Sequence, residues 1–170
     1  MKREQKIVAA GAAAGTFAMI AALLALASIL ISLPPAADAG ERLAFAVKWT
    51  ALAAAPLFIS IIAVGNGRFL SEAIDPTAGK ESKAMIINGR VVDNTLQQYV
   101  LFVAASLAVA ATSRGDQLSL VASAAIVFVA CRFAFWIGYR IDPMHRAAGF
   151  ASTAYLNIIL FGVAIWRAWA

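Results

Sequence analysis

Three arginines of this sequence, Arg90, Arg132 and Arg146, lie within or directly beside long apolar stretches. A charged side chain at the centre of a bilayer costs roughly 2.5–3.5 kcal/mol on insertion scales, so such residues usually mark a functional site. The planar guanidinium group binds carboxylates through paired hydrogen bonds. Together the arginines predict a site for a small anionic molecule that carries carboxylates.

Polar residues beside the first arginine have the spacing of one helix face. Arg90, Asn94 and Gln97 follow the pattern i, i+4, i+7. They share a face if the helix begins about a turn before the apolar run that opens at Asn94. This arrangement would place a guanidinium group and two amides on the same side of one helix.

A second helix face carries aromatic side chains together with an arginine. Arg132, Phe135 and Tyr139 are spaced i, i+3, i+7, and a short turn containing a proline then leads to Arg146. Two helices and one turn would therefore bring guanidinium groups, amides and a phenol to the same level of the membrane. We interpret this level as the functional end of the protein.

Arginines near helix ends can also extend to lipid headgroups without any further function. For Arg114 and Arg140 we favour this interpretation. Arg132 differs, because it lies about two turns inside its apolar segment, and that segment contains no Asp or Glu. Its partner is then a polar group on another helix, a lipid phosphate or an anionic ligand.

The composition indicates an integral membrane protein. Of the 170 residues, 62% are hydrophobic and 14% are charged, and the mean hydropathy is +0.81; soluble domains average about 45–50% apolar and about 25% charged residues. The net charge of +5 does not indicate nucleic-acid binding, since the basic residues lie at the ends of apolar runs. The single cysteine, Cys131, excludes an intramolecular disulfide and suits a packing role, and no cluster of Cys and His suggests a metal site.

Five stretches approach the roughly 20 residues that a membrane-spanning helix needs. A backbone in hydrocarbon must satisfy its own hydrogen bonds, so each stretch is predicted to be a helix. We expect an all-α membrane protein with one N-terminal transmembrane helix within residues 1–36 and a four-helix membrane domain over residues 43–170. The expected helices of that domain are at about 43–66, 94–112, 117–139 and 146–168.

The first apolar segment, residues 7–33, could instead belong to a signal peptide. A basic start precedes it, and residues 37–39 resemble a cleavage site. However, the segment is about twice as long as the usual apolar region of 7–15 residues. We therefore favour a helix that is retained in the mature protein.

The basic residues predict the orientation in the membrane, because cytoplasmic loops are enriched in Lys and Arg. A cytoplasmic N-terminus places nine of them inside and only Arg42, Arg114 and Arg167 outside. It also puts the longest predicted loop, residues 65–93, on the same face as the turn 140–146. Within that loop, residues 86–92 could form a hairpin on an Asn-Gly turn, but we favour a turn that leads into the third helix. We expect the membrane to be the bacterial inner membrane.

The chain resembles the MAPEG family, the membrane-associated proteins in eicosanoid and glutathione metabolism. The resemblance rests on the order and spacing of Arg90, Asn94, Gln97, Arg132, Phe135, Tyr139 and Arg146. It covers roughly residues 43–170 and leaves the first helix as an addition to the four helices of the family. It implies a homotrimer that binds glutathione between neighbouring subunits, near the cytoplasmic face.

By the same resemblance, Arg146 matches the arginine that stabilises the glutathione thiolate in the leukotriene-forming branch. This role agrees with elementary chemistry, because a guanidinium group beside a thiol favours the reactive thiolate. The residues that the resemblance assigns to glutathione binding are Arg68, Arg90, Asn94, Gln97, Arg132 and Tyr139.

Four positions depart from the pattern of the family. Gln97 stands where the family usually has Glu, which removes a negative charge that could pair with the ammonium group of glutathione. Gln98 occupies a position that holds Tyr in the leukotriene-forming branch. Phe135 and Phe150 lie at or near positions where characterised members have Tyr or His. These changes remove hydroxyl groups and one carboxylate from the expected site.

Three functions are consistent with these observations. The first is a glutathione transferase or peroxidase that acts on lipophilic electrophiles or lipid hydroperoxides from the bilayer. The second is a non-catalytic trimeric membrane protein of the same family that serves as a scaffold or binds another anion or a lipid. The third is a small transporter or channel component, although no pair of matching helices is broken by Gly or Pro as in transporter repeats.

Overall fold

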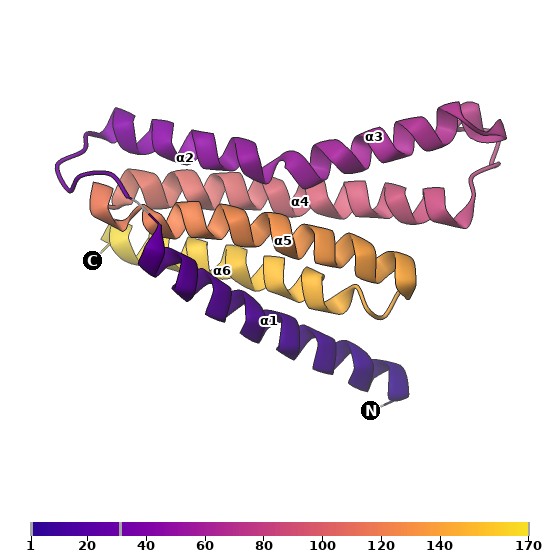
Figure 1. The fold of residues 1–170 in the computed structure, drawn as a ribbon, viewed down its shortest axis with the longest axis horizontal. Helices are drawn as coiled ribbons and strands as arrows, with labels where there is room; N and C mark the ends of the chain where they lie inside the picture. The colour runs from indigo at the N-terminus through magenta and orange to yellow at the C-terminus, as the bar shows by residue number, and fades with distance from the viewer. Residues whose placement is uncertain (1, 31, 170) are drawn as a thin grey trace.

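A computed structural model describes residues 2–30 and 32–169 as a bundle of long helices that lie side by side (Figure 1). Five helical stretches of 23 to 31 residues are long and apolar enough to span a membrane, with α2 and α3 together forming one of them. The predicted all-α membrane architecture is therefore confirmed. The helices are α1 (Arg3–Ile29), α2 (Ala39–Ala53), α3 (Ala55–Phe69), α4 (Lys83–Thr112), α5 (Ser119–Ile141) and α6 (Ala147–Trp169), with short 3₁₀ turns η1 (Glu72–Ile74) and η2 (Gly115–Gln117).

The second spanning segment bends where α2 meets α3, as Figure 1 shows. The break falls at Ala54, two residues before the buried Pro56. Proline has no backbone N–H and its ring crowds the preceding turn, so it ends or kinks a helix at this point. The interruption at Pro56 was visible in the sequence, and the structure places the bend there.

The N-terminal end of α4 corrects the prediction for the long loop. We expected a loop over residues 65–93, but α3 continues to Phe69 and α4 begins at Lys83. The Ser82 hydroxyl caps α4 by accepting a hydrogen bond from the backbone N–H of Met85 at 3.3 Å. The Asn-Gly pair lies within this helix. The turn that we favoured there is therefore wrong, as is the hairpin considered for residues 86–92.

Packing explains why α4 starts so early. Val91 is buried against Phe135 and Tyr139 of α5, and Asn88 and Met85 are buried on the same side of α4. A turn at the Asn-Gly pair would have removed these contacts. The early start also meets the condition for the predicted polar face, because it makes Arg90 helical.

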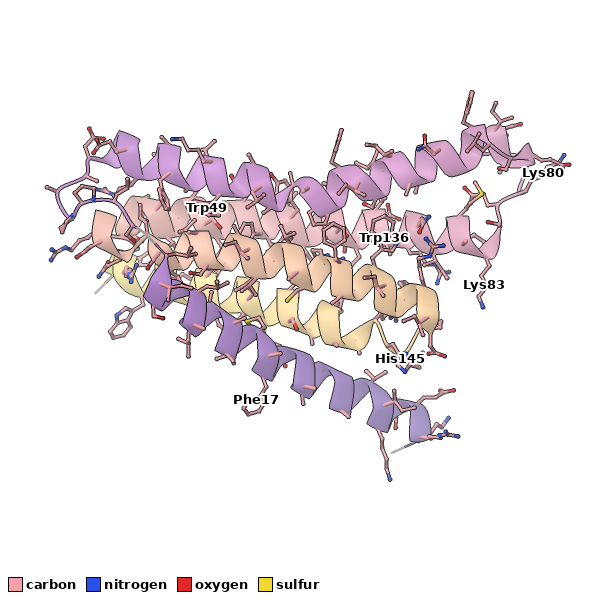
Figure 2. All side chains as sticks on the ribbon, in the orientation of Figure 1. Phe17, Trp49, Lys80, Lys83, Trp136 and His145 are labelled. Carbon is pink, nitrogen blue, oxygen red and sulfur yellow. The ribbon has the colours of Figure 1, made fainter. Side chains whose placement is uncertain are left out.

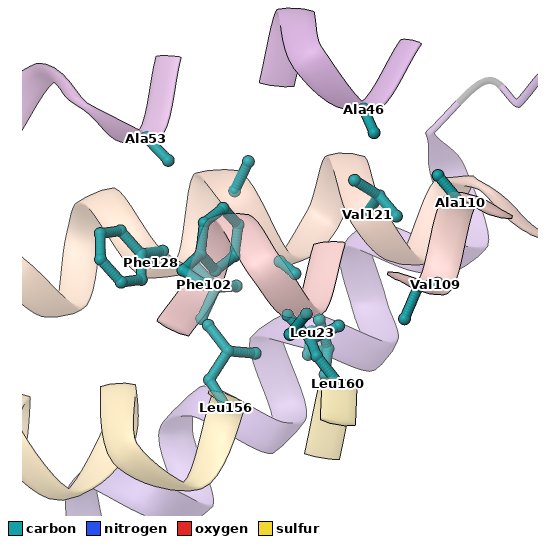
Figure 3. Packing of buried hydrophobic residues seen from close by; sticks show 14 of the residues in the cluster. Leu23, Ala46, Ala53, Phe102, Val109, Ala110, Val121, Phe128, Leu156 and Leu160 are labelled. Atoms are coloured by element: carbon teal, nitrogen blue, oxygen red, sulfur yellow. The ribbon is translucent and has the colours of Figure 1, made fainter. Parts of the chain in front are cut away.

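The core consists of small residues around a few large ones (Figure 3). The rings of Phe102 on α4 and Phe128 on α5 lie 4.6 Å apart. Alanines such as Ala46 and Ala53 on α2 are fully buried in the same cluster. Lipid is as apolar as leucine, so close contact through small side chains stabilises such bundles.

Helix α1 packs across α5 and α6 instead of lying apart from them. Met19 and Leu23 of α1 are almost fully buried in the core. At Gly15 the two backbones approach so closely that a Cβ would lie 2.5 Å from the carbonyl oxygen of Ala148 on α6. Figure 1 shows α1 crossing the bundle obliquely, with its N-terminal end away from the other helices.

Basic side chains gather at one end of the bundle. Lys80 and Lys83 lie at this end, as does His145 in the turn between α5 and α6 (Figure 2). The loop between α3 and α4 and the turn between α5 and α6 therefore share one end of the molecule, as the sequence predicted. His145 is exposed there, as is usual for a polar residue in a turn between helices.

Candidate functional site

A pocket of about 800 Å³ opens near the basic end of the bundle, between α1, α4, α5 and α6. This volume lies in the range of about 300–1,000 Å³ that is usual for small-molecule sites. Four residues that the sequence assigned to the site line the pocket: Arg90 and Asn94 from α4, Tyr139 from α5, and Arg146 from the turn before α6. The remaining lining residues are Val8, Ala12, Phe135, Pro143, Met144, Ala147, Phe150, Ala151, Ala154, Tyr155 and Ile158.

Tyr139 connects the two arginines of the pocket. Nη1 of Arg90 donates a hydrogen bond of 3.4 Å to the Tyr139 hydroxyl oxygen. The guanidinium carbon of Arg146 lies 4.9 Å from the centroid of the Tyr139 ring, within the range of a cation–π contact. Both arginines are exposed, whereas Tyr139 is buried. The two cations therefore flank one phenol at the mouth of the pocket.

Arg132 lies behind the pocket as a buried cation and is only 1% exposed. Its Nη2 donates hydrogen bonds to Oδ1 of Asn94 at 3.0 Å and to the Thr95 hydroxyl at 2.9 Å. Its Nη1 donates to the Thr153 hydroxyl on α6 at 3.2 Å. The guanidinium group thus joins α4, α5 and α6, and its partners among the described residues are neutral.

Two observations connect this buried network to the pocket. Asn94 both lines the pocket and accepts a hydrogen bond from Arg132, so the cation orients a side chain that a ligand can reach. The guanidinium carbon of Arg132 also lies 4.1 Å from the centroid of Phe135, another lining residue. Its Nε is buried and makes no hydrogen bond in the described structure. Arg132 therefore adds positive potential from behind the wall.

Two sets of polar residues were not predicted from the sequence: those that face Arg132 and those that join α4 to α6. Thr95 and Thr153 were not selected, although they supply two of the three groups that Arg132 binds. Asn157 donates a hydrogen bond of 3.0 Å to the side-chain oxygen of Gln98. The sequence offered one signal for them: Thr153 and Asn157 lie four positions apart in the mainly apolar α6. Polar residues in a membrane-spanning helix usually face other helices.

Besides the buried Arg132, two predicted site residues do not line the pocket of their own chain. Arg68 at the end of α3 forms an ion pair of 2.8 Å with Glu81. Gln97 is exposed on α4, whereas its neighbour Gln98 is the buried member of the glutamine pair. The expected face of Arg90, Asn94 and Gln97 is therefore divided, with only the first two residues in the pocket.

The charge of the pocket selects for anions. Arg90 and Arg146 line it and Arg132 lies behind it, while none of the described lining residues is Asp or Glu. Guanidinium groups bind carboxylates with good geometry, so a molecule with two carboxylates such as glutathione fits the donors that are present. Its ammonium group would find no acidic residue among the described lining residues, and the side-chain oxygen of Asn94 already accepts a hydrogen bond from Arg132.

Cys131 lies outside this pocket, in a second cleft of about 300 Å³ between α1, α5 and α6. The lining of that cleft is almost entirely apolar, and the cysteine is half-buried in it. This placement agrees with the packing role that we expected.

Comparison with known proteins supports the sequence pattern. A model of the MAPEG family matches residues 46–166, which is most of the chain and includes α3 to α5 and nearly all of α6. Helix α1 lies outside the matched range. No curated protein and no solved structure gives a significant match.

Proposed function

Because the chain belongs to the MAPEG family, we propose that it is a membrane-bound, glutathione-dependent transferase or peroxidase that acts on lipophilic electrophiles or lipid hydroperoxides. The observation that carries the proposal is the convergence of Arg90, Asn94, Tyr139 and Arg146 on one pocket with apolar walls. Such a pocket can hold a polar anion at its mouth and a lipophilic molecule beside it.

Arg146 is the residue that we assign to catalysis. Bound glutathione would supply the thiol that attacks the electrophile or reduces the hydroperoxide. Arg146 is exposed at the pocket, and its guanidinium group lies over the Tyr139 ring, so it can approach a ligand. A guanidinium group beside a thiol stabilises the thiolate and increases its reactive fraction at neutral pH.

The remaining assigned residues hold the tripeptide. Arg90, Asn94 and Tyr139 would contact it directly, and Arg132 would orient Asn94 and contribute charge. We further propose a homotrimer in which Arg68 and Gln97 face the pocket of a neighbouring protomer. The position of both residues outside their own pocket and the exposure of Gln97 support this arrangement.

The membrane supplies the second substrate. Apolar molecules concentrate in the bilayer, and the pocket lies between membrane-spanning helices. We propose that the N-terminus is cytoplasmic, since the basic end of the bundle then faces the compartment that the positive-inside rule assigns to it. The bacterial inner membrane is the location we expect.

Calorimetry with glutathione tests the proposal directly. Detergent-purified protein is expected to bind glutathione, and Arg146→Ala is expected to lose conjugation of 1-chloro-2,4-dinitrobenzene while it keeps its oligomeric state. Arg140→Ala serves as the matched control, because Arg140 is exposed in the last turn of α5 and does not line the pocket. Full activity of Arg146→Ala would refute the catalytic role.

A non-catalytic binder of anions or lipids is the second candidate. It is favoured by one observation, the lack of an acidic side chain among the described lining residues, which leaves the ammonium group of glutathione without an acidic partner. This candidate predicts no heat of binding with glutathione up to about 10 mM, equivalent to a binding free energy weaker than about −2.7 kcal/mol. Saturable binding below that concentration would exclude it.

A further inference from the structure

Helix α1 packs directly beside the residue that we assign to catalysis, although it lies outside the region that matches the family. Gly11 faces the first residue of α6, since a Cβ on Gly11 would lie 3.8 Å from the Cβ of Ala147. Gly15 comes closer still, because a Cβ there would lie 2.5 Å from the carbonyl oxygen of Ala148. These contacts place α1 against the two residues that follow Arg146 in the chain.

Helix α5 holds the same part of the chain through a second close contact. A Cβ on Gly138 would lie 2.7 Å from the carbonyl oxygen of His145 and 3.3 Å from the backbone N of Arg146. At both glycines the neighbouring atoms belong to the backbone, which cannot give way by a change of rotamer. The segment 145–148 is therefore held by α5 at its start and by α1 at its end.

The side chain of Arg146 depends on this segment. Arg90 and Tyr139 lie within α4 and α5, whereas Arg146 lies in the turn directly before α6. Val8 and Ala12 of α1 line the pocket together with it. A movement of α1 against the segment 145–148 would therefore move the guanidinium group of Arg146 relative to Arg90 and Tyr139.

We propose that Gly15 is a positioning residue for catalysis, because it lets α1 hold the segment 145–148 and so sets the distance between the guanidinium group of Arg146 and the thiol of bound glutathione. This inference rests on the proposed glutathione-dependent function. A thiolate about 5 Å instead of about 4 Å from a guanidinium group is attracted roughly a fifth less strongly. At an effective dielectric constant of about 20, this change raises the pH midpoint of thiolate formation by about 0.6.

Gly15→Ala tests the contact against a matched control in the same helix. Its Cβ overlaps the backbone of Ala148, so α1 and the segment 145–148 must separate by about 1 Å. Gly11→Ala is the same change of residue type, but its Cβ would be in ordinary van der Waals contact at 3.8 Å. The pH midpoint, followed by the ultraviolet absorbance of bound glutathione thiolate, is expected to rise by about 0.6 in Gly15→Ala and to keep the wild-type value in Gly11→Ala.

The kinetic constants should separate in the same variant. A misplacement of about 1 Å can cost up to about 100-fold in rate, so kcat is expected to fall in Gly15→Ala. The Kd for glutathione should stay close to the wild-type value, because Arg90 and Asn94 lie on α4, which Gly15 does not touch. A loss confined to binding, with kcat unchanged, would contradict the proposal.

Met19→Ala distinguishes positioning from a general loosening of α1. Met19 is only 2% exposed and belongs to the core, so its truncation costs stability by leaving a cavity. It adds no atom at the contact between Gly15 and Ala148. We expect a lower Tm with an unchanged pH midpoint. An equal rise of the midpoint in Met19→Ala and Gly15→Ala, or no rise in Gly15→Ala, would overturn the proposal.

A spectroscopic measurement separates failure of this inference from failure of the proposed function. His145 is the only histidine of the sequence and directly precedes Arg146 (Figure 2). Its imidazole therefore gives a single NMR signal from the segment 145–148 in tag-free protein labelled with ¹⁵N-histidine. Without glutathione, this signal is expected to shift in Gly15→Ala but not in Gly11→Ala. Such a shift supports the hold of α1 on the segment even if no glutathione binds, and an unshifted signal overturns it.

Gly11→Ile carries the test if Gly15→Ala does not fold. Its branched side chain must fit against the same segment at Ala147 and Ala148. The pH midpoint and the His145 signal are expected to move in the direction predicted for Gly15→Ala, by a smaller amount. Wild-type values of both in a folded Gly11→Ile protein would overturn the proposal.

Discussion

Gly149 on α6 provides a sharp test of how the site is assembled. A Cβ at this position would overlap the backbone of α5, with the Cα of Phe135 only 2.6 Å away. Ordinary van der Waals contact begins near 3.4 Å, and the backbone N of Phe135 lies closer to the Cβ than its Cα does. Gly149→Ala must therefore separate α5 and α6 by about 1 Å. The site depends on this contact, because Tyr139 lies on α5 while Arg146 directly precedes α6 and Phe150 lies on it.

The same helix contains a matched control. Gly162 also lies within α6, and a Cβ there would meet no atom within 4 Å. Gly162→Ala is therefore expected to stabilise the protein by about 1 kcal/mol through helix propensity alone. Gly149→Ala gains the same propensity but also bears an overpacking cost of about 1–3 kcal/mol. The two variants should thus differ by about 2 kcal/mol in stability.

Thermal unfolding in one detergent measures this difference. A change of 1 kcal/mol shifts the Tm of a protein of this size by about 2–4 °C, so Gly149→Ala should melt about 4–8 °C below Gly162→Ala. Glutathione affinity should also fall in Gly149→Ala, since the two sides of the pocket move apart. Equal Tm values for the two variants would refute the close contact between α5 and α6.

Three further predictions follow from the polar contacts. Arg132→Lys should lower the Tm by about 2–5 °C, because an ammonium group cannot reach all three partners and each lost bond between membrane helices is worth about 0.6 kcal/mol. Arg140→Lys, measured in the same way, should melt like the wild type. Asn157→Leu should destabilise the protein more than the double variant Gln98→Leu/Asn157→Leu, because the single change leaves the buried Gln98 amide unpaired. Additive effects in a double-mutant cycle would contradict the pairing of these two residues. Arg68→Gln should change stability by less than about 1 kcal/mol, as expected for a partly exposed ion pair, and should weaken glutathione binding in calorimetry if Arg68 faces a neighbouring protomer.

The number and approximate position of the membrane-spanning segments could be predicted from the sequence. Hydrocarbon accepts only segments that are long, apolar and internally hydrogen-bonded, and this requirement acts locally along the chain. The bend at Pro56 was predictable for the same reason, since proline changes the helix in which it stands. Helical spacing also predicted that Arg90 and Asn94 share one face and that Phe135 and Tyr139 share another, and these four residues line the pocket. The same spacing failed for Gln97, which lies outside it.

The start of α4 and the partners of the buried polar groups were decided only by the tertiary structure. The Asn-Gly pair favours a turn locally, but burial of Val91 against Phe135 and Tyr139 keeps the chain helical there. Of two adjacent glutamines, only Gln98 meets a partner on α6, because a rotation of about 100° per residue separates neighbouring side chains.

The contribution of α1 to the pocket likewise could not be read from its residues. Val8 and Ala12 belong to an apolar run that would look the same if it faced only lipid. Their role follows from the close approach of Gly15 to α6, which is a property of two backbones together. Hydropathy thus determined which segments enter the membrane, and contacts between helices determined which side chains meet at the site. Hydropathy cannot decide the second point, because lipid and the protein interior are equally apolar and only packing distinguishes a side chain that faces lipid from one that faces another helix.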